Sequence, residues 1–327
     1  MSSLYFRVRE RVRRNQTISQ LLYLTQALQA SLFGRVARQT RAAVDKRGGV
    51  AVCMRFRDEA PYIEEWLDYH ILAGVDHFFL YNNYSSDHYN ELLQPYVASG
   101  HATLIDWPRT PASPAAEEDA LLRALGRYQW IGFIDADEFL VIRGGRSIGE
   151  FLSEYEAFPA VVLHWRYFGS NGHVERPKAP VIEAYTRSAA GPNGHVKSFL
   201  QAKWAAQGRN PQSWCYRGVR SAVNENRKAV LGSVSRPPSA ELAWLNHYYC
   251  KSEQDYLEKA QRKSSLDHVS IRFPSRTIAK LKTELAQYND VYNPCAIEYR
   301  EQRRAIAARN RTLISPDTPP VILRQSR

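Results

Sequence analysis

Three carboxylates lie within four positions in the stretch IGFIDADEF, residues 131 to 139, directly after an apolar run. If this stretch is a strand, Asp135 and Asp137 point to the same side and Ala136 points away, because side chains alternate along a strand. Two carboxylates at that spacing offer the hard oxygen ligands that Mg²⁺ and Mn²⁺ prefer. The pattern therefore predicts a divalent-cation site, with a solvated acidic turn as the alternative.

A histidine flanked by aromatic residues lies in LNHYYCKS, residues 245 to 252. A neutral imidazole is a common metal ligand, so His247 could complete the ligand shell of the cation. The alternative is a histidine whose hydrogen bonds are satisfied inside the core.

The segments before the carboxylates alternate between strand-like and helix-like patterns. Such alternation is typical of an α/β fold whose largely parallel sheet carries helices on both faces and binds ligands beyond the carboxyl ends of its strands. The acids of residues 135–138 follow such an end. Pro95 is expected to kink the helix around it or to stop it early. The expected order is strand 50–56, helix 61–74, strand 77–83, helix 89–97, strand 102–107, helix 115–129 and strand 130–139.

After residue 159 the sequence changes to short β-like runs separated by Gly, Asn and Pro, which predicts a mixed second half. Highly charged helical patterns follow at 252–263 and 275–312. The expected fold class is thus an α/β mixed sheet flanked by helices, with a helical C-terminal extension. The β-like runs are 160–169, 181–187, 196–202 and 243–250.

The composition excludes several classes of protein. With 327 residues, 44% of them hydrophobic, the chain can bury a sizeable core, which argues against disorder. No run approaches eighteen apolar residues and the start is too charged for a signal peptide, so we expect a cytoplasmic protein. The cysteines form no CxxC pair, which argues against a zinc knuckle or a dense disulfide framework and predicts reduced thiols. They are Cys53, Cys215, Cys250 and Cys295.

The formal net charge of +11 favours polyanionic partners. Arginines gather near both ends of the chain, and leucines recur at roughly helical spacing over residues 15 to 38. This segment could form an amphipathic helix resting on the inner face of a membrane. The alternative is a helix docked on its own domain.

The chain resembles glycosyltransferase family 92, the DUF23-like group within the family 2 superfamily, over about residues 50 to 263. The stretches that carry the resemblance are, in order, RDEAPYIEEWLDYHILAGVDHFFLYNNYSSD, WIGFIDADEFL, HWRYFGSNGH, HVKSF, VNEN and LNHYYCKSEQDYLEKAQRK. The resemblance implies a GT-A fold, a nucleotide-sugar donor, Mn²⁺ or Mg²⁺ at the DxD motif and transfer with inversion. The expected division is a basic amphipathic segment 1–48, a transferase domain 49–263 and a charged helical extension and tail 264–327.

The resemblance also implies which residues contact the donor. Two of the motifs depart from the family pattern: Arg57, Asp58 and Glu59 replace the common Lys-Asn-Glu, and Asn82 with Asn83 replaces the common Asp-Asn. Asn82 lacks a carboxylate that could accept hydrogen bonds from the ribose or base, so the sequence predicts metal use more firmly than nucleobase preference. The predicted donor contacts are Arg57, Glu59, Asn82, Asn83, Asp87, Ala136 and Lys197.

Inverting transfer needs a base for the acceptor hydroxyl, which in this fold is usually an Asp or Glu between the metal motif and the later histidine. The glutamates in that window are Glu175, Glu183, Glu225 and Glu241. Glu225, in the matched motif VNEN, is the predicted base, and a turn glutamate that caps backbone amides is the alternative.

The stretch HWRYFGSNGH joins aromatic residues to a turn of small residues, a composition suited to stacking on a sugar ring. We expect acceptor contacts from His164, Trp165 and His173. For Trp165 the alternative is packing in the core.

These features together predict a metal-dependent, inverting transferase that moves a hexose from a UDP-sugar, with galactose as the first guess. The acceptor would be a cell-surface glycan, a polysaccharide or a lipid-linked molecule. One alternative is a basic nucleic-acid-binding protein that stacks bases near YRGVR, residues 216 to 220, and another is a nucleotide-sugar hydrolase with the same metal site. No nucleic-acid partner is expected, because an acidic cluster repels phosphate unless a cation intervenes.

Overall fold

The computed structural model describes residues 48–313 except 111, 211, 219, 262–282 and 284–286, together with four earlier positions. These four are helical and exposed: Thr25, Leu28, Gln29 and Leu32. The predicted amphipathic helix over 15–38 otherwise lies outside the described residues. None of the helices within the described part of the chain is long and apolar enough to cross a bilayer.

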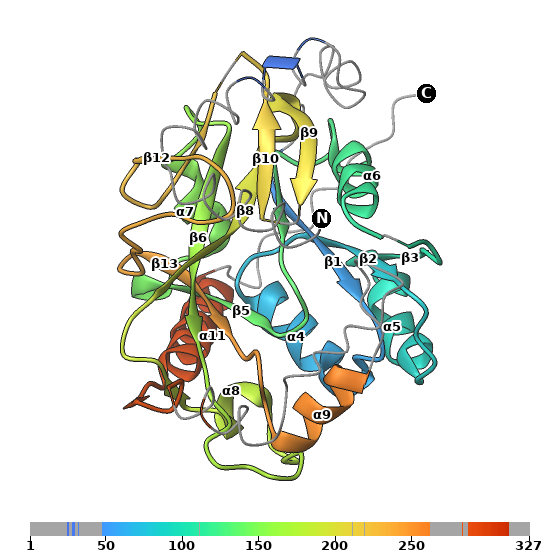
Figure 1. The fold of residues 1–327 in the computed structure, drawn as a ribbon, viewed down its shortest axis with the longest axis vertical. Coiled ribbons are helices and arrows are strands. Elements are labelled where there is room, and N and C mark those ends of the chain that lie inside the picture. Colours follow the sequence, from blue (N-terminus) through green and yellow to red (C-terminus); the bar gives the residue numbers. More distant parts are fainter. Residues whose placement is uncertain are drawn as a thin grey trace, which may run out of the picture.

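A mixed sheet forms the centre of the molecule (Figure 1). Its strands are β1 (Val50–Phe56), β2 (His77–Asn82), β3 (Ala102–Asp106), β4 (Trp130–Phe133), β5 (Glu138–Ile142), β6 (Ala160–Tyr167), β8 (Asn193–Leu200), β11 (Ala222–Val223), β12 (Ala229–Val230) and β13 (Ala243–His247). The order is β12-β11-β6-β8-β4-β1-β2-β3, with β13 beside β6 and β5 beside β13. Strands β3, β2, β1 and β4 are parallel, whereas β8 runs antiparallel to β4 and β6. The predicted fold class, an α/β mixed sheet with flanking helices, is confirmed.

Helices cover both faces of this sheet. They are α4 (Ala60–Leu72), α5 (Tyr89–Ala98), α6 (Ala115–Ala124), α7 (Ile148–Ser153), α8 (Val181–Ala184), α9 (Glu253–Gln261) and α11 (Cys295–Leu313). Val50, Val52 and Met54 of β1 pack in one core with α4, α7 and α11. Ala51 and Cys53 pack on the other face with α6 and the hairpin of β9 (Ala205–Asn210) and β10 (Ser213–Tyr216). Alternate side chains of β1 therefore enter the two cores on opposite faces of the sheet.

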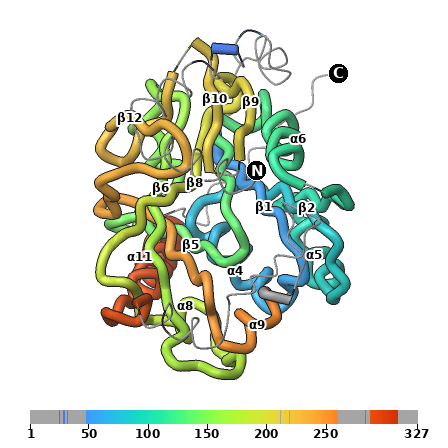
Figure 2. Tube along the Cα trace, in the orientation of Figure 1, coloured from blue at the N-terminus to red at the C-terminus, as the bar shows by residue number. Residues whose placement is uncertain are grey.

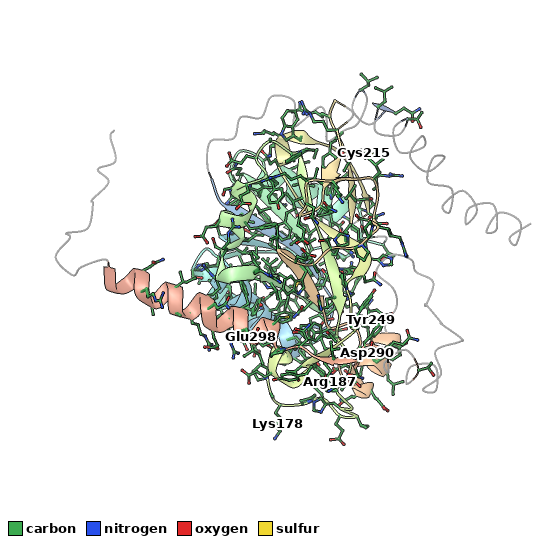
Figure 3. The ribbon with its side chains drawn as sticks, turned by 90° about the vertical axis from the view of Figure 1, so that its left-hand side faces the viewer. Lys178, Arg187, Cys215, Tyr249, Asp290 and Glu298 are labelled. Carbon is green, nitrogen blue, oxygen red and sulfur yellow. The ribbon has the colours of Figure 1, made fainter. Side chains whose placement is uncertain are left out.

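The helical C-terminal extension is present as α11. Its first turns pack on the body, where Ala296 and Tyr299 are buried and the Tyr299 hydroxyl donates to the Arg146 carbonyl at 2.8 Å. Figure 3 shows α11 leaving the body of the molecule beyond the part labelled Glu298. A small sheet of β7 (Arg187–Ser188) and β14 (Val291–Tyr292) joins the chain just before α11 to the segment after α8.

One expected strand is a helix, and one of the two outcomes expected at Pro95 does not occur. The run 181–187 forms the short helix α8 rather than a strand, because the Glu65 carboxylate accepts hydrogen bonds from the Val181 and Ile182 amides and so caps the start of a helix. The early stop at Pro95 does not occur: α5 continues to Ala98, and its last turn closes with a hydrogen bond from the Ser99 amide to the Pro95 carbonyl. Proline lacks a donor but keeps its acceptor.

The stretch 131–139 is also not one strand. β4 ends at Phe133 and β5 begins at Glu138, and the two acids of the DxD lie in the turn between them. β4 lies beside β1 and β8, whereas β5 pairs with β13, so the chain changes its place in the sheet at this turn.

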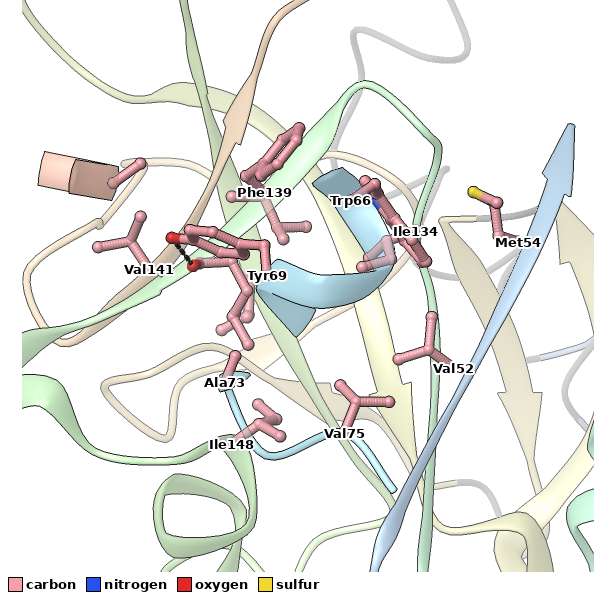
Figure 4. Close-up of a cluster of buried hydrophobic side chains, with 14 of the residues drawn as sticks. Val52, Met54, Trp66, Tyr69, Ala73, Val75, Ile134, Phe139, Val141 and Ile148 are labelled. Carbon is pink, nitrogen blue, oxygen red and sulfur yellow. Dashed lines mark hydrogen bonds between the residues drawn. The ribbon is translucent and has the colours of Figure 1, made fainter. Parts of the chain in front are cut away.

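β13 pairs with one edge of β5, and side chains of α4 hydrogen-bond to the backbone groups on the other edge. The Trp66 indole donates to the Glu138 carbonyl at 2.9 Å. The Tyr69 hydroxyl donates to the Leu140 carbonyl at 2.8 Å, the bond that is dashed in Figure 4. His70 Nε2 accepts from the Leu140 amide at 3.3 Å, while Nδ1 lies 2.7 Å from the Trp66 carbonyl and donates to it. Three buried polar side chains thus fix β5 against the helix, as buried backbone groups require.

We expect this arrangement to make stability depend on pH through His70. Burial lowers the pKa of His70 from 6.5 to about 4, so its contribution is complete above pH 6.5 and is lost as the pH falls toward 4. Between pH 7.5 and 5 the wild type should lose ~2 kcal/mol of unfolding free energy that the His70→Leu variant does not lose. Urea unfolding of both proteins at the two pH values measures this difference. The exposed His88→Gln variant is the control, and an equal loss in wild type and His70→Leu would contradict the assignment.

Candidate active site

The DxD turn is held from inside by Glu138. The Glu138 amide donates to the Asp135 carbonyl at 3.1 Å, and its carboxylate accepts from the Asp135 amide at 2.8 Å. The Trp66 indole also approaches the Asp135 carbonyl, at 3.1 Å. The expectation that Asp135 and Asp137 lie side by side on a strand is therefore wrong, because these bonds close a turn instead and the two carboxylates meet different partners.

Asp135 pairs with Lys197, which rises from β8. Lys197 Nζ lies 2.6 Å from Asp135 Oδ2 and 3.5 Å from Glu138 Oε2, and its side chain is only 1% exposed. Exclusion of water would raise the pKa of Asp135, but the ammonium outweighs this effect and keeps that pKa below its ordinary value. Burial raises the pKa of Glu138 well above its ordinary value despite the same lysine. The two neighbouring acids thus differ because Asp135 is partly exposed and makes the short contact with the Lys197 ammonium, whereas Glu138 is completely buried.

Asp137 pairs with His247 and Lys259. Its Oδ1 lies 3.4 Å from His247 Nε2, and its Oδ2 lies 2.5 Å from Lys259 Nζ. Burial would raise the pKa of Asp137, but Lys259 and His247 hold it well below its ordinary value. The strand that carries His247 is tied to the turn by a backbone hydrogen bond from the Tyr248 amide to the Asp137 carbonyl at 2.8 Å.

These residues fit a divalent cation at one end of the DxD. A separation of 3.4 Å is long for a hydrogen bond, but it is close to the roughly 3 Å between adjacent ligands of an octahedral ion with bonds of about 2.1 Å. Oxygen from Asp137 and nitrogen from His247 are also suitable donors for Mn²⁺. Asp135 contacts Lys197 instead, and in the described part of the chain no three His, Cys, Asp or Glu side chains gather into a metal cluster. Two of the three predicted metal ligands are thus brought together.

Four of the residues predicted to contact the nucleotide lie at the carboxyl ends of β1 and β2, and Asp87 lies in the loop after β2. There Asn82 donates to the Tyr89 hydroxyl and to Asp106, while Asn83 donates to two backbone carbonyls. Asp87 accepts from the Ala60 amide at 2.8 Å, which caps the start of α4. These three side chains hold the loops that border the site, so their contact with a nucleotide stays a prediction.

Arg57 and Glu59 follow β1 at the same edge. The Arg57 guanidinium lies 6.0 Å from the centre of the Tyr84 ring, and Glu59 Oε2 lies 3.6 Å from Lys251 Nζ. Ala136 is buried within the DxD turn. The predicted donor contacts thus surround one edge of the sheet.

Aromatic rings stand beside His247. The rings of Trp165 and His247 have centres 4.5 Å apart, and Tyr167 stacks on His247 at 5.2 Å. His195 also stacks on Trp165, with ring centres 5.2 Å apart. Trp165 is buried, which agrees with the alternative that it packs in the core. It also lies beside the two candidate metal ligands, and Lys197 Nζ is 5.9 Å from the centre of its ring.

The other two predicted acceptor contacts are placed elsewhere. His164 precedes Trp165 on β6 and therefore points to the opposite face of the sheet. His173 donates through Nε2 to the Ala184 carbonyl at 3.1 Å, and its own carbonyl accepts from the Glu253 amide. It joins its loop to α8 and α9, and the structure does not bring it to the DxD turn.

Glu225 has four hydrogen-bond donors around its carboxylate. The backbone amides of Glu241, Leu242 and Ala243 donate to it at 2.9, 2.7 and 2.8 Å, and the Ser239 hydroxyl donates as well. This is the capping arrangement of the alternative interpretation. The assignment of Glu225 as the base stays a prediction.

Sequence reasoning missed three residues of the site: Glu138, Lys251 and Lys259. Each lies in a stretch that carries the family resemblance, and for Lys259 the sequence contains a signal. Asp255 and Lys259 are four residues apart on α9, so they share one face of the helix. On that face Asp255 accepts from the Tyr62 hydroxyl and Lys259 meets Asp137.

Removing the buried ammonium group of Lys197 should destabilise the protein. In Lys197→Met, Glu138 would remain buried without its counterion, so we expect the unfolding free energy to fall by about 3–5 kcal/mol. The double variant Lys197→Met/Glu138→Leu removes both charges and should recover part of the loss. Urea unfolding measures both values, with the exposed Lys228→Met variant as control. Unchanged stability in Lys197→Met would contradict a structural role for this ion pair.

Comparison with known proteins agrees with the motifs. Residues 48–197 match the model of the family described as Glycosyltransferase family 92. A family 92 protein of Oryza sativa subsp. japonica is 33% identical over 162 residues, which cover 48% of this chain and 27% of that protein. One from Arabidopsis thaliana is 29% identical over 179 residues, covering 48% and 30%. The chain thus spans less than a third of the length of these curated relatives.

Two solved structures are weakly similar to this chain. TarS of S. aureus, residues 1–349, matches with 12% identity and a TM-score of 0.34 over 83% of this chain and 75% of that chain. Glucosyl-3-phosphoglycerate synthase from Mycobacterium tuberculosis, solved with Mn²⁺, UDP and glucosyl-3-phosphoglycerate, matches with 15% identity and a TM-score of 0.28 over 52% and 61%. Likenesses this weak carry no conclusion about the site. The family match does not depend on them: residues 48–197 of this chain are similar to glycosyltransferase family 92.

Proposed function

We propose that this chain is a metal-dependent glycosyltransferase that uses a nucleotide-sugar donor and inverts the sugar carbon. The observation that carries the proposal is the pair of Asp137 and His247 at the carboxyl end of β4, within a sheet whose first strands match family 92. Asp137 and His247 would hold Mn²⁺ or Mg²⁺, with Asp135 beside them.

The donor would lie across three neighbouring strand ends. β2, β1 and β4 are adjacent and parallel, so the residues that follow them share one edge of the sheet. Glu59 follows β1, Asn83 follows β2 and Asp137 follows β4. A nucleotide at the first two ends would place its diphosphate at the third.

The bound cation would neutralise the charge that develops on the departing nucleoside diphosphate. The task of the chain is to fix the two aspartates before the donor arrives. Glu138 and Trp66 hold the backbone of the turn, and Lys197 keeps Asp135 ionised. The acceptor hydroxyl must lose a proton during its attack, and Glu225 would have to give up backbone hydrogen bonds to receive it.

The resemblance to family 92 supports the finer proposals. It favours a hexose, with UDP-galactose as the first donor to test, and a cell-surface glycan, polysaccharide or lipid-linked acceptor. The ring of Tyr167, which is only partly buried beside His247, would suit a sugar at the acceptor side of the site.

The nucleotide proposal is tested by thermal unfolding with UDP, GDP and ADP, each with and without Mn²⁺. We expect UDP to raise the melting temperature only when Mn²⁺ is present, and Asp137→Asn to abolish that rise. Transfer by Asp137→Asn should fall by about 100-fold or more, because the cation loses a charged ligand. Glu91→Gln, at an exposed carboxylate on α5, is the matched control.

If no nucleotide stabilises the protein, the proposal of a nucleotide-sugar donor is overturned. Mn²⁺-dependent cleavage of UDP-galactose without transfer to any acceptor would favour the hydrolase instead. Salt-sensitive RNA binding without a metal requirement would favour the nucleic-acid-binding alternative.

We further propose that the basic and leucine-rich segment before residue 46 places the enzyme on anionic membranes, near lipid-linked acceptors. Deleting residues 1–45 should therefore abolish co-sedimentation with vesicles that contain phosphatidylglycerol, and 0.5 M salt should weaken the binding of the full chain. Phosphatidylcholine vesicles are the control. Equal sedimentation of the shortened and full chains would remove this proposal.

A further inference from the structure

Three lysines surround the DxD turn, and one of them differs from the other two. Lys197 is buried against Asp135 and Glu138. Lys251 is buried too, with its Nζ 3.5 Å from the centre of the Tyr62 ring. Lys259, by contrast, is 44% exposed and makes a contact of 2.5 Å with Asp137 Oδ2.

The helix that carries Lys259 is anchored elsewhere. Asp255 accepts from the Tyr62 hydroxyl at 2.5 Å and from the Ser252 hydroxyl at 2.6 Å, and Arg176 donates to it at 2.7 Å. Figure 2 shows α9 close to α4, and the bond between Tyr62 and Asp255 joins these two helices. The side chain of Lys259 can therefore leave Asp137 without release of the helix.

Lys259 and a divalent cation compete for the same carboxylate. Asp137 directs Oδ1 to His247 and Oδ2 to Lys259, so an ion bound by Asp137 and His247 would lie next to the ammonium. The repulsion between these two cations grows as water is excluded from the site. Lys259 must then pair with another anion.

The diphosphate of the donor is an anion within reach, in addition to Glu59, whose charge also acts on Lys259. Its oxygens would ligate the same cation at about 2.1 Å, which places them beside Asp137. The four-carbon stem of lysine lets its ammonium follow a displacement of this size.

We propose that Lys259 is a charge-exchange residue: it neutralises Asp137 before the cation binds and moves to the donor diphosphate afterwards. This inference rests on the proposed function. It assigns a donor-binding role to α9, and it makes binding of the cation alone weaker than binding of the cation together with the nucleotide. A lysine that merely packs the helix, or one that replaces the cation permanently, predicts neither effect.

The test uses the full chain with Lys259→Met and Lys259→Arg, and Lys228→Met as an exposed control. Free Mn²⁺ is followed by electron paramagnetic resonance without nucleotide, and UDP binding is measured by calorimetry at saturating Mn²⁺. Lys259→Met should bind Mn²⁺ more tightly, because its competitor is gone, and should bind UDP about tenfold more weakly, because a charged hydrogen bond is lost. Lys259→Arg should retain UDP binding within about threefold of wild type, since the charge remains. Lys228→Met should match the wild type in both measurements.

The outcomes separate the exchange from its alternatives. Weaker Mn²⁺ binding in Lys259→Met would show that the lysine supports the site structurally and would overturn the exchange. UDP binding that is unchanged in Lys259→Met would overturn the diphosphate contact, and so would wild-type UDP binding of equal strength without Mn²⁺. If the wild type binds Mn²⁺ but no UDP, the proposed donor has failed, whereas tighter Mn²⁺ binding in Lys259→Met would still support the competition at Asp137.

Discussion

The ion pair between Lys197 and the acids of the DxD turn is the interaction on which the site depends. Glu138 is completely buried, and a buried carboxylate is tolerated only when a cation or hydrogen-bond donors satisfy it. Lys197 supplies the charge from β8, while the Asp135 amide supplies a hydrogen bond from the turn itself. The same lysine thus satisfies the acid that shapes the turn and pairs with the first acid that the turn presents.

The second constraint is the short gap between β4 and β5. The chain leaves its place between β1 and β8, crosses the turn and pairs with β13, whose last residue is His247. Register pairs His247 with Glu138, so the imidazole reaches the turn as a consequence of strand pairing. The backbone groups on the other edge of β5 form hydrogen bonds with three side chains of α4, those of Trp66, Tyr69 and His70. The site is therefore positioned by backbone pairing on one side and by side chains on the other.

The sequence allowed much of the first half of the fold to be predicted, because local signals agree with tertiary contacts there. The β-like run 50–56 and the helix before Gly74 each appear with boundaries within about two residues. The failures arise where a distant group decides the local structure. Glu65 caps α8 from another helix, and Glu138 turns an apparent strand into a bend. No periodicity in 181–187 or 131–139 encodes those partners.

The same distinction holds within the site. Asp137 and His247, whose types suggested a cation, do lie together, whereas Asp135 meets a lysine that no spacing rule connects to it. Lys259 was hidden because its role depends on where α9 packs.

The docking of α11 extends the physical limits of the domain. Ala296 and Tyr299 belong to the same buried core as β5 and α4, and Arg303 donates to the Leu72 carbonyl at the end of α4. Gly145 allows this approach, since a Cβ there would lie 2.8 Å from the Gln302 side chain. A fragment cut after residue 263 would consequently expose apolar surface behind the helix that supports the DxD turn. It would lose rigidity at the edge that carries the candidate site, although every residue of that edge would still be present.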